Sequence, residues 1–189
     1  MKPDWANCQI GVMGSSNTDL SEGERQRLRE TAERLGLAIA AQGCSLITGA
    51  TTGLPDMVSR VVRQHGGLTV GLSPAISKME HLEQYQYPLD AVDVMIYTGF
   101  GLKGRNVINI RSSDIVIIFG GGMGTLNEFT IAYDEGKVIG ILEDSGGIAG
   151  HLRAIIDFAN KPTTSRLIYD SVPERLIDEC LAVWRGVKA

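Results

Sequence analysis

Short apolar runs rich in β-branched residues alternate along this chain with longer stretches of mixed polarity. The runs lie at residues 9–13, 45–48, 68–72, 92–97, 114–119 and 138–142. Strands this apolar are typical of a parallel sheet that is buried on both faces. The alternation therefore predicts an α/β fold: a single Rossmann-like domain whose parallel β-sheet is flanked by helices on both faces.

The stretches between these runs have the features of helices. Ser21 and Glu24 have the spacing of a capping box at the start of a long helix, which Gly43 ends. Further helices are expected over residues 57–62, from about 105, from 125, and in two C-terminal segments within 150–186, the second of them from 171. Residues 73–90 have little pattern, and we expect them to form a loop over one end of the sheet.

The composition fits one folded domain over residues 1–189, because 43% of the residues are apolar and 21% are charged. The net charge of −4 argues against nucleic acid as the main partner. A small anionic ligand is still compatible with this charge, since backbone N–H groups bind phosphate whatever the global charge of the protein.

The cysteines and histidines are few and scattered. Cys8, Cys44 and Cys180 form no C-x-x-C pair, which indicates buried thiols in a reducing compartment. The histidines have no metal-ligand spacing, so we expect no metal site. No apolar stretch approaches the length of a membrane span, and residues 1–5 lack the apolar core of a signal peptide. These observations favour a cytoplasmic protein without membrane association.

Three glycine-bearing turns follow predicted strands, at Gly14-Ser15, from Gly49 to Gly53, and from Gly120 to Thr125. Ligands of parallel sheets bind at the carboxyl ends of the strands. The three turns therefore predict one shared binding site at that edge of the sheet.

The turn after Phe119 is the strongest candidate for a phosphate site. Its sequence is Gly120-Gly121-Gly122-Met123-Gly124-Thr125, between a predicted strand and a predicted helix. Free N–H groups and the helix dipole favour an anion there, and glycines leave room for it. The alternative is a tight turn without a ligand. We favour phosphate binding, because a second glycine turn and the T-x-x-E pattern accompany this one.

Two charged residues near this turn each allow two interpretations. Glu128 lies three positions after Thr125, so the pair either forms a capping box or places a carboxylate beside the ligand. Arg105 lies near the start of a predicted helix, where a cation is unfavourable. It is therefore either a partner of an anionic ligand or a solvated surface residue. Arg111 is expected at the surface.

These motifs resemble those of the LOG-like superfamily, Rossmann-fold proteins once described as lysine decarboxylases. Its cytokinin riboside monophosphate phosphoribohydrolases carry P-G-G-x-G-T-x-x-E, and residues 120–128 match this motif except that Gly120 replaces the proline. Arg105 precedes Glu128 at the spacing of a family arginine, and Arg111 matches a second one. The resemblance covers about residues 9–142.

Two departures point to another branch of the superfamily. Asn106 stands where the phosphoribohydrolases have lysine, and their G-G-G-x-x-G-L-M-G motif is only half kept from Gly49 onwards, with Pro55-Asp56 in place of Met-Gly. The stretch from Gly104 to Asp114 is more similar to the molybdenum cofactor carriers, which also keep a matching arginine and glutamate.

The resemblance implies two alternative functions. A carrier or binder would hold a phosphorylated nucleotide-like ligand, such as the molybdenum cofactor or a nucleoside monophosphate, without chemistry. A phosphoribohydrolase would cleave the N-glycosidic bond of a nucleoside 5′-monophosphate, with Arg105 and Glu128 as catalytic residues and no cofactor required for the chemistry. We favour the binder.

The resemblance also implies a homodimer or a higher homo-oligomer. The residues expected to bind the ligand are Gly14, Ser15, Gly49, Gly53, Arg105, Gly121, Gly122, Met123, Gly124 and Thr125.

Overall fold

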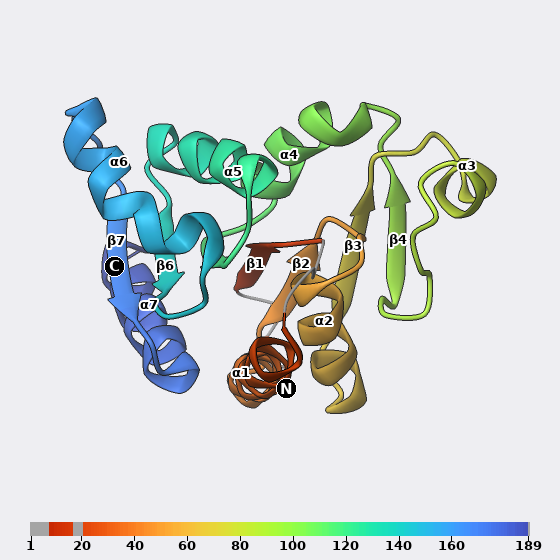
Figure 1. The fold of residues 1–189 in the computed structure, drawn as a ribbon, viewed down its shortest axis with the longest axis horizontal. Helices are drawn as coiled ribbons and strands as arrows, with labels where there is room; N and C mark the ends of the chain where they lie inside the picture. The colour runs from red at the N-terminus through yellow and green to blue at the C-terminus, as the bar shows by residue number, and fades with distance from the viewer. Residues whose placement is uncertain (1–7, 17–20, 189) are drawn as a thin grey trace.

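The structure is a computed structural model that describes residues 8–16 and 21–188. The prediction that residues 1–5 are no signal peptide concerns residues outside this part of the chain. Within it, seven parallel strands form one sheet in the order β4-β3-β2-β1-β5-β6-β7 (Figure 1). The strands are β1 Gln9–Gly14, β2 Ser45–Thr48, β3 Thr69–Ser73, β4 Val94–Tyr97, β5 Ile115–Phe119, β6 Val138–Leu142 and β7 Arg166–Asp170.

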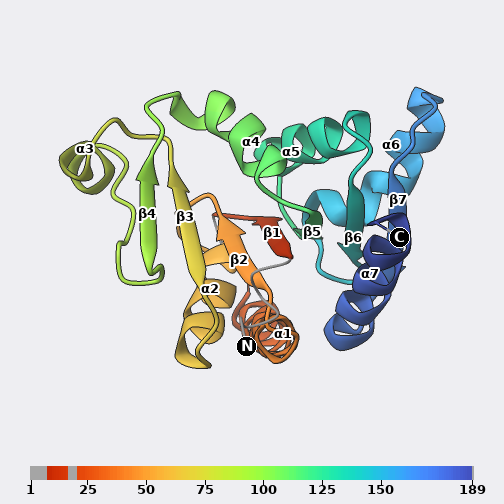
Figure 2. The same cartoon turned by 180° about the vertical axis from the view of Figure 1, so that it is seen from behind.

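Helices cover both faces of this sheet, which confirms the predicted α/β Rossmann-like fold. Helices α1, α2 and α7 lie on one face, and α4, α5 and α6 lie on the other, while α3 lies beyond the β4 edge (Figures 1 and 2). The helices are α1 Glu22–Ala41, α2 Leu54–Gln64, α3 Lys78–Glu83, α4 Gly101–Arg111, α5 Met123–Asp134, α6 Leu152–Ala159 and α7 Pro173–Lys188, with a 3-10 turn η2 at Gly147–His151 before α6.

Strand β5 shows why an unbroken apolar run folds in this way. Its five residues are completely buried. Ile115, Ile117 and Phe119 belong to the hydrophobic cluster between the sheet and α1, α2 and α7. Val116 and Ile118 belong to the cluster under α4, α5 and α6. Alternate side chains of a strand point to opposite faces, so each face of the sheet needs apolar residues.

The strand order places a topological switch point between β1 and β5. From β1 the chain builds outward through β2, β3 and β4, and then it returns to add β5, β6 and β7 on the other side. The carboxyl ends of β1 and β5 therefore lead into loops that diverge, and Gly14 pairs with Phe119 at this point. Open α/β sheets bind ligands in the crevice at such a point.

Six of the seven strands are predicted by the apolar runs, and β7 is not. Strand β7 is an edge strand, and only Ile168 of its five residues is fully buried. Strand β4 at the opposite edge was expected to be buried on both faces, which is wrong. Val94 and Ile96 are about half exposed, at 45% and 46%. Edge strands lack a neighbour on one side, so burial does not impose the same pattern on them.

Several helix starts differ from the predictions. The capping box of Ser21 and Glu24 is confirmed. Helix α4 begins at Gly101, so Arg105 lies in its second turn rather than at its start. Helix α7 begins at Pro173 rather than Ser171. The segment 73–90 was expected to be a loop, but it contains the short helix α3, which Ser77 caps by accepting the N–H of Glu80.

Candidate functional site

A pocket of about 390 Å³ opens at the carboxyl edge of the sheet, beside the switch point. This volume lies in the range usual for small-molecule sites. The turns after β1 and β2, the helices α4 and α5, and residue 87 from the α3–β4 connection line it. The lining residues are Val12, Met13, Gly14, Ser15, Ser16, Gly49, Thr51, Pro55, Tyr87, Leu102, Lys103, Arg105, Asn106, Gly122, Met123, Gly124, Thr125 and Glu128.

The glycines after β5 divide into two kinds. Gly120 and Gly121 have φ angles of +63° and +91°, in the region that favours glycine. Gly122 has a φ of −132°, and Gly124 lies in the first turn of α5, so neither needs glycine for its backbone conformation. A β-carbon at Gly122 or Gly124 would meet no atom within 4 Å. The first two glycines shape the turn, and the other two leave space in the pocket.

The start of α5 is open to an anion. Gly122 is the N-cap residue, and no side chain caps this helix in the described part of the chain. The first N–H groups of a helix have no partner within it, and the dipole adds about half a positive charge at this end. Met123 and Gly124 are exposed in the same turn and line the pocket. The expected phosphate loop therefore places an uncapped helix start beside the pocket.

The capping-box interpretation of Thr125 and Glu128 is wrong. Helix α5 begins at Met123, so Thr125 is its third residue and Glu128 lies in the second turn. The Thr125 side chain is buried under Gly121, where a β-carbon would overlap it. Glu128 is freed from any capping role, and it lines the pocket instead.

Arg105 and Glu128 form a buried ion pair at the floor of the pocket. Arg105 Nη1 lies 3.6 Å from Glu128 Oε1, and both side chains are less than 10% exposed. The interpretation of Arg105 as a solvated surface residue is therefore wrong. Arg111 is at the surface as predicted, with its side chain 68% exposed and paired with Glu135.

Two amides complete the surroundings of the Glu128 carboxylate. Asn109 Nδ2 lies 3.5 Å from Glu128 Oε1 and 3.1 Å from the sulfur of Met13. The Asn106 amide nitrogen donates to Asn127 Oδ1 at 2.8 Å in one orientation of the amide, and in the swapped orientation it donates to Glu128 Oε1 at 3.3 Å and to the carbonyl oxygen of Leu102 at 2.9 Å. Neutral donors therefore surround a carboxylate that has one charged partner.

Burial dominates the titration of this pair. It raises the pKa of Glu128 above its ordinary value of 4.5, while Arg105 and the Asn109 amide act in the opposite direction. Burial also lowers the pKa of Arg105, and the nearby Glu128 and Tyr87 oppose that shift. A carboxyl group with a raised pKa next to a pocket is a feature of many functional sites.

Two buried polar atoms have no hydrogen-bond partner within the described residues, Arg105 Nε and Asn109 Oδ1. Each such atom costs about 1–3 kcal/mol compared with a satisfied one. Arg105 lines the pocket with other atoms of its side chain, because Nε itself is shielded from it. The missing partner of Nε is therefore a cost of burying the ion pair with Glu128.

The remaining predicted ligand-binding residues are not all in the pocket. Gly14, Ser15 and Gly49 line it. Gly121 lines a smaller neighbouring pocket of about 170 Å³. Gly53 lines neither; its φ is +84°, and a β-carbon there would meet the Ser15–Ser16 backbone. Gly53 therefore packs against the turn after β1, and a side chain at this position would collide with that turn.

Sequence reasoning missed Tyr87 and Lys103, which also line the pocket. Tyr87 belongs to the weakly patterned segment that was expected to be a plain loop. Lys103 lies in the first turn of α4, two residues before Arg105. The proximity of Lys103 to the LOG-like arginine was a usable signal, and Tyr87 offered only its aromatic type. Asp56, a departure from the family motif, does not line the pocket, because Arg60 binds its carboxylate at 2.8 Å.

In residues 8–16 and 21–188, no three acidic, cysteine or histidine side chains gather in a way that could hold a metal ion. Over the same residues no helix combines the length and the apolar character needed to cross a membrane.

Comparison with known proteins places the site in a family context. The sequence model of the SLOG cluster4 family matches residues 7–177. An uncharacterized protein of Archaeoglobus fulgidus is 34% identical over 142 residues, which cover 75% of this chain and 84% of that protein. A cytokinin riboside 5′-monophosphate phosphoribohydrolase of Mycobacterium marinum is 29% identical over 79% of each chain. The molybdenum cofactor binding protein of Rippkaea orientalis is 28% identical, with a TM-score of 0.72 over 96% of this chain and 98% of that one.

Proposed function

The chain belongs to the SLOG cluster4 family of the LOG-like superfamily, and from this we propose that its pocket binds a phosphorylated, nucleotide-like small molecule. The phosphate would lie at Gly122 to Thr125. One observation carries the proposal: Gly122 and Gly124 are glycines that the backbone does not require, and both face open space at the start of α5. Their missing side chains let a phosphate reach the N–H groups of the helix.

Arg105 supports the proposal from the other side of the pocket. Its side chain is buried and lines the pocket, and Glu128 lies 3.6 Å from its Nη1. A phosphate or another electron-rich group of the ligand would be attracted by this cation. The pocket volume of about 390 Å³ is compatible with a mononucleotide or a phosphorylated pterin.

We favour binding without chemistry, as in a carrier of the molybdenum cofactor or a nucleotide-binding protein. Most glycoside-cleaving sites use a pair of carboxylates, one as acid and one as base or nucleophile. Among the described residues that line this pocket, Glu128 is the only one with a carboxylate. Its Oε1 faces Arg105, Asn106 and Asn109, which hold it in place as a structural partner.

One observation favours the alternative, a nucleoside 5′-monophosphate phosphoribohydrolase. Glu128 is buried at the pocket, and burial raises its pKa, as in many acid–base residues. A carboxylate there can stabilise an oxocarbenium-like transition state and orient water. Arg105 would then steady the leaving group, while the N–H groups of α5 anchor the phosphate and fix the reacting geometry.

Incubation with AMP, followed by chromatography for free adenine, separates the two functions. A binder gives a calorimetric titration signal with AMP and no adenine release. A phosphoribohydrolase releases adenine and ribose 5-phosphate at a rate proportional to the protein concentration. If nucleoside monophosphates and phosphorylated pterins all fail to bind, the proposal is wrong.

The proposal includes a cytoplasmic setting and a homodimer. All three cysteines are buried and form no disulfide among the described residues, as suits a reducing compartment. The dimer rests on the resemblance to the LOG-like proteins alone.

A further inference from the structure

Tyr87 lines the pocket and belongs to the connection between α3 and β4. It packs against His81, which hydrogen-bonds Ser73, the last residue of β3. The glycine turn follows β5, and strands β1 and β2 lie between β5 and β3 in the sheet. The pocket therefore extends across several strand ends, with an anion site at one end and an aromatic ring at the other.

The ring of Tyr87 packs against a buried histidine, His81. His81 is completely buried, with Nδ1 hydrogen-bonded to Ser73 Oγ at 2.8 Å and Nε2 to the carbonyl oxygen of Pro88 at 3.1 Å. The Tyr87 ring packs edge-on against it with centroids 5.8 Å apart. Tyr85 stacks on Tyr87 at 5.7 Å. These contacts leave the ring of Tyr87 little freedom to turn.

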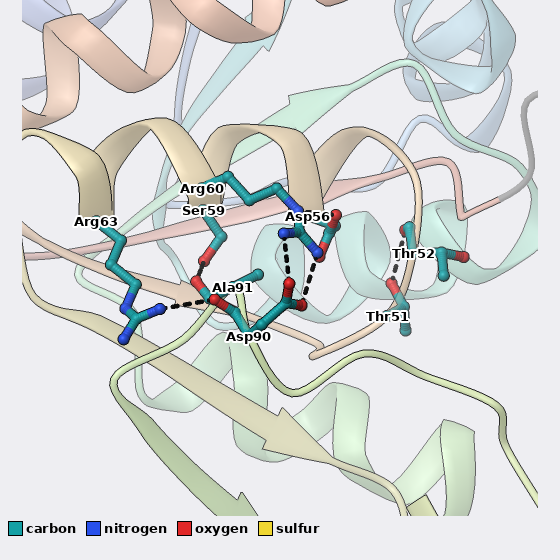
Figure 3. Close-up of polar contacts among 8 residues, drawn as sticks. All are labelled: Thr51, Thr52, Asp56, Ser59, Arg60, Arg63, Asp90 and Ala91. Atoms are coloured by element: carbon teal, nitrogen blue, oxygen red, sulfur yellow. Dashed lines mark hydrogen bonds and ion pairs between the residues drawn. The ribbon is translucent and has the colours of Figure 1, made fainter. Parts of the chain in front are cut away.

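Helix α2 fixes the segment that follows Tyr87. Arg60 donates through both terminal nitrogens to the Asp90 carboxylate at 2.8 Å, as Figure 3 shows. Arg63 donates to the carbonyl oxygen of Asp90 at 2.7 Å, and Ser59 donates to that of Ala91, also at 2.7 Å. Asp56 holds Arg60 from the opposite side (Figure 3). Arg63 also binds the Asp93 carboxylate at 2.8 Å, so the α3–β4 connection is tied to α2 at two backbone carbonyls and two side chains.

We propose that Tyr87 is a specificity-determining residue, the wall on which the planar heteroaromatic ring of the ligand packs. This inference rests on the proposed phosphate site and adds the class of the group at the other end of the ligand. Aromatic rings stack on nucleobases, and the loss of one such contact weakens binding about tenfold. The fixed ring of Tyr87 makes that contact at little cost in conformational entropy.

Arg105 lies between the two ends and suits the same ligand. Its guanidinium packs on Gly49 after β2, and its pKa responds to the nearby Tyr87 as well as to Glu128. A ligand that bridges the glycine turn and Tyr87 must pass this arginine. The order of groups therefore fits phosphate, sugar or linker, and ring.

Two ligands that share a phosphate test the inference on its own. AMP has the ring, and ribose 5-phosphate lacks it. Titrations of both ligands are made with the wild type and with Tyr87→Leu, Tyr87→Phe and Phe158→Leu. Phe158 is an exposed aromatic residue of α6 that does not line the pocket, so Phe158→Leu is the control for the loss of a ring.

We expect Tyr87→Leu to weaken AMP binding about tenfold and to leave ribose 5-phosphate binding within about twofold, while Tyr87→Phe and Phe158→Leu keep AMP binding. Unchanged AMP affinity in Tyr87→Leu overturns the inference and leaves the phosphate site intact. So does an equal loss for both ligands, since that marks a general disturbance of the pocket. If the wild type binds neither ligand nor a phosphorylated pterin, the proposed function fails and the inference fails with it.

Discussion

The guanidinium of Arg105 lies directly on the α-carbon of Gly49, so close that a β-carbon at position 49 would overlap its Nη1 and Cζ atoms. Gly49 follows β2, and Arg105 lies in the second turn of α4, so the contact joins two elements that are far apart in the chain. The glycine has no left-handed φ to explain it. Its role is to leave room for the arginine.

Gly49→Ala is therefore expected to displace Arg105 from the pocket. Overpacking of a filled site costs about 1–3 kcal/mol of unfolding free energy, and we expect AMP affinity to fall together with stability. Urea denaturation and calorimetric titration measure the two effects. Gly23→Ala is the control, because Gly23 lies in α1 with nothing within 4 Å of an added β-carbon. Equal behaviour of the two variants would contradict the role of Gly49.

The two kinds of glycine in the turn after β5 predict opposite outcomes for the same substitution. Gly122→Val should leave the melting temperature nearly unchanged and reduce AMP affinity about tenfold or more, because its side chain occupies the phosphate space. Gly121→Val should destabilise the fold by about 1–3 kcal/mol, since it places a β-branched residue at a φ of +91°. Thermal melts and titrations of both variants test this. A folded Gly122→Val variant that binds AMP with full affinity would show that the phosphate does not bind at this turn.

Glu128→Gln separates the two candidate functions. In a phosphoribohydrolase, the amide keeps the shape of the side chain and removes its charge, so base release should fall by about 10² to 10³ while AMP still binds. In a carrier, neither the wild type nor the variant releases base, and the substitution changes ligand affinity alone. Base release, titration and thermal melting on the same two proteins make the distinction. Full hydrolytic activity in Glu128→Gln would exclude Glu128 as a catalytic residue.

Arg105→Met leaves the Glu128 carboxylate buried without its counter-charge, and the loss should reach about 3–5 kcal/mol at neutral pH. Burial already raises the pKa of Glu128 in the fold, and Arg105 limits that rise. A raised pKa favours the protonated folded form, so the stability it brings is present at low pH and is lost as pH rises through the folded pKa. The variant should therefore recover stability relative to wild type between pH 7 and pH 5.

Urea denaturation at both pH values measures that recovery. Arg111→Met makes the same change at an exposed arginine, whose partner is Glu135, and it should show no such pH dependence. An Arg105→Met deficit that is equal at pH 7 and pH 5 would mean that Glu128 is not the group left unpaired.

The expected homodimer predicts a mass near twice the 20.4 kDa of one chain in light scattering at micromolar concentration. The β4 edge exposes Val94 and Ile96 next to Phe100, which is 68% exposed. Exposed apolar surface of this kind is common at interfaces between subunits. If β4 lies in the interface, Ile96→Lys should shift the mass to that of one chain. A wild-type mass of one chain would contradict the dimer.

The sequence predicted the middle of the fold well, because burial on both faces imposes long apolar runs such as Ile115 to Phe119. The edges were harder to predict. Strand β7 has mixed polarity, since half of its surroundings is solvent, and it was missed.

The part of the site that the backbone forms was predictable, and the side chains around it were less so. The turn after β5 was recognised because four glycines lie between a predicted strand and a predicted helix. The interpretation of Thr125 and Glu128 as a cap failed because α5 starts at Met123, which moves both residues inside the helix. Tyr87 gave no usable pattern, since its place in the pocket depends on His81 and on the ion pairs of α2, which are contacts between distant parts of the chain.

Both halves of the chain supply the pocket, with Gly49 from the first and Gly122 and Glu128 from the second. The halves join in the sheet along β1 and β5, where Met13 lies opposite Ile118. A bound ligand therefore contacts both halves of the chain, and it stabilises their packing in the folded protein by mass action. Amide hydrogen exchange along β1 and β5 should slow on binding. No residue of β5 lines the pocket, so slower exchange there would report occupancy of the site from backbone groups that the ligand does not touch.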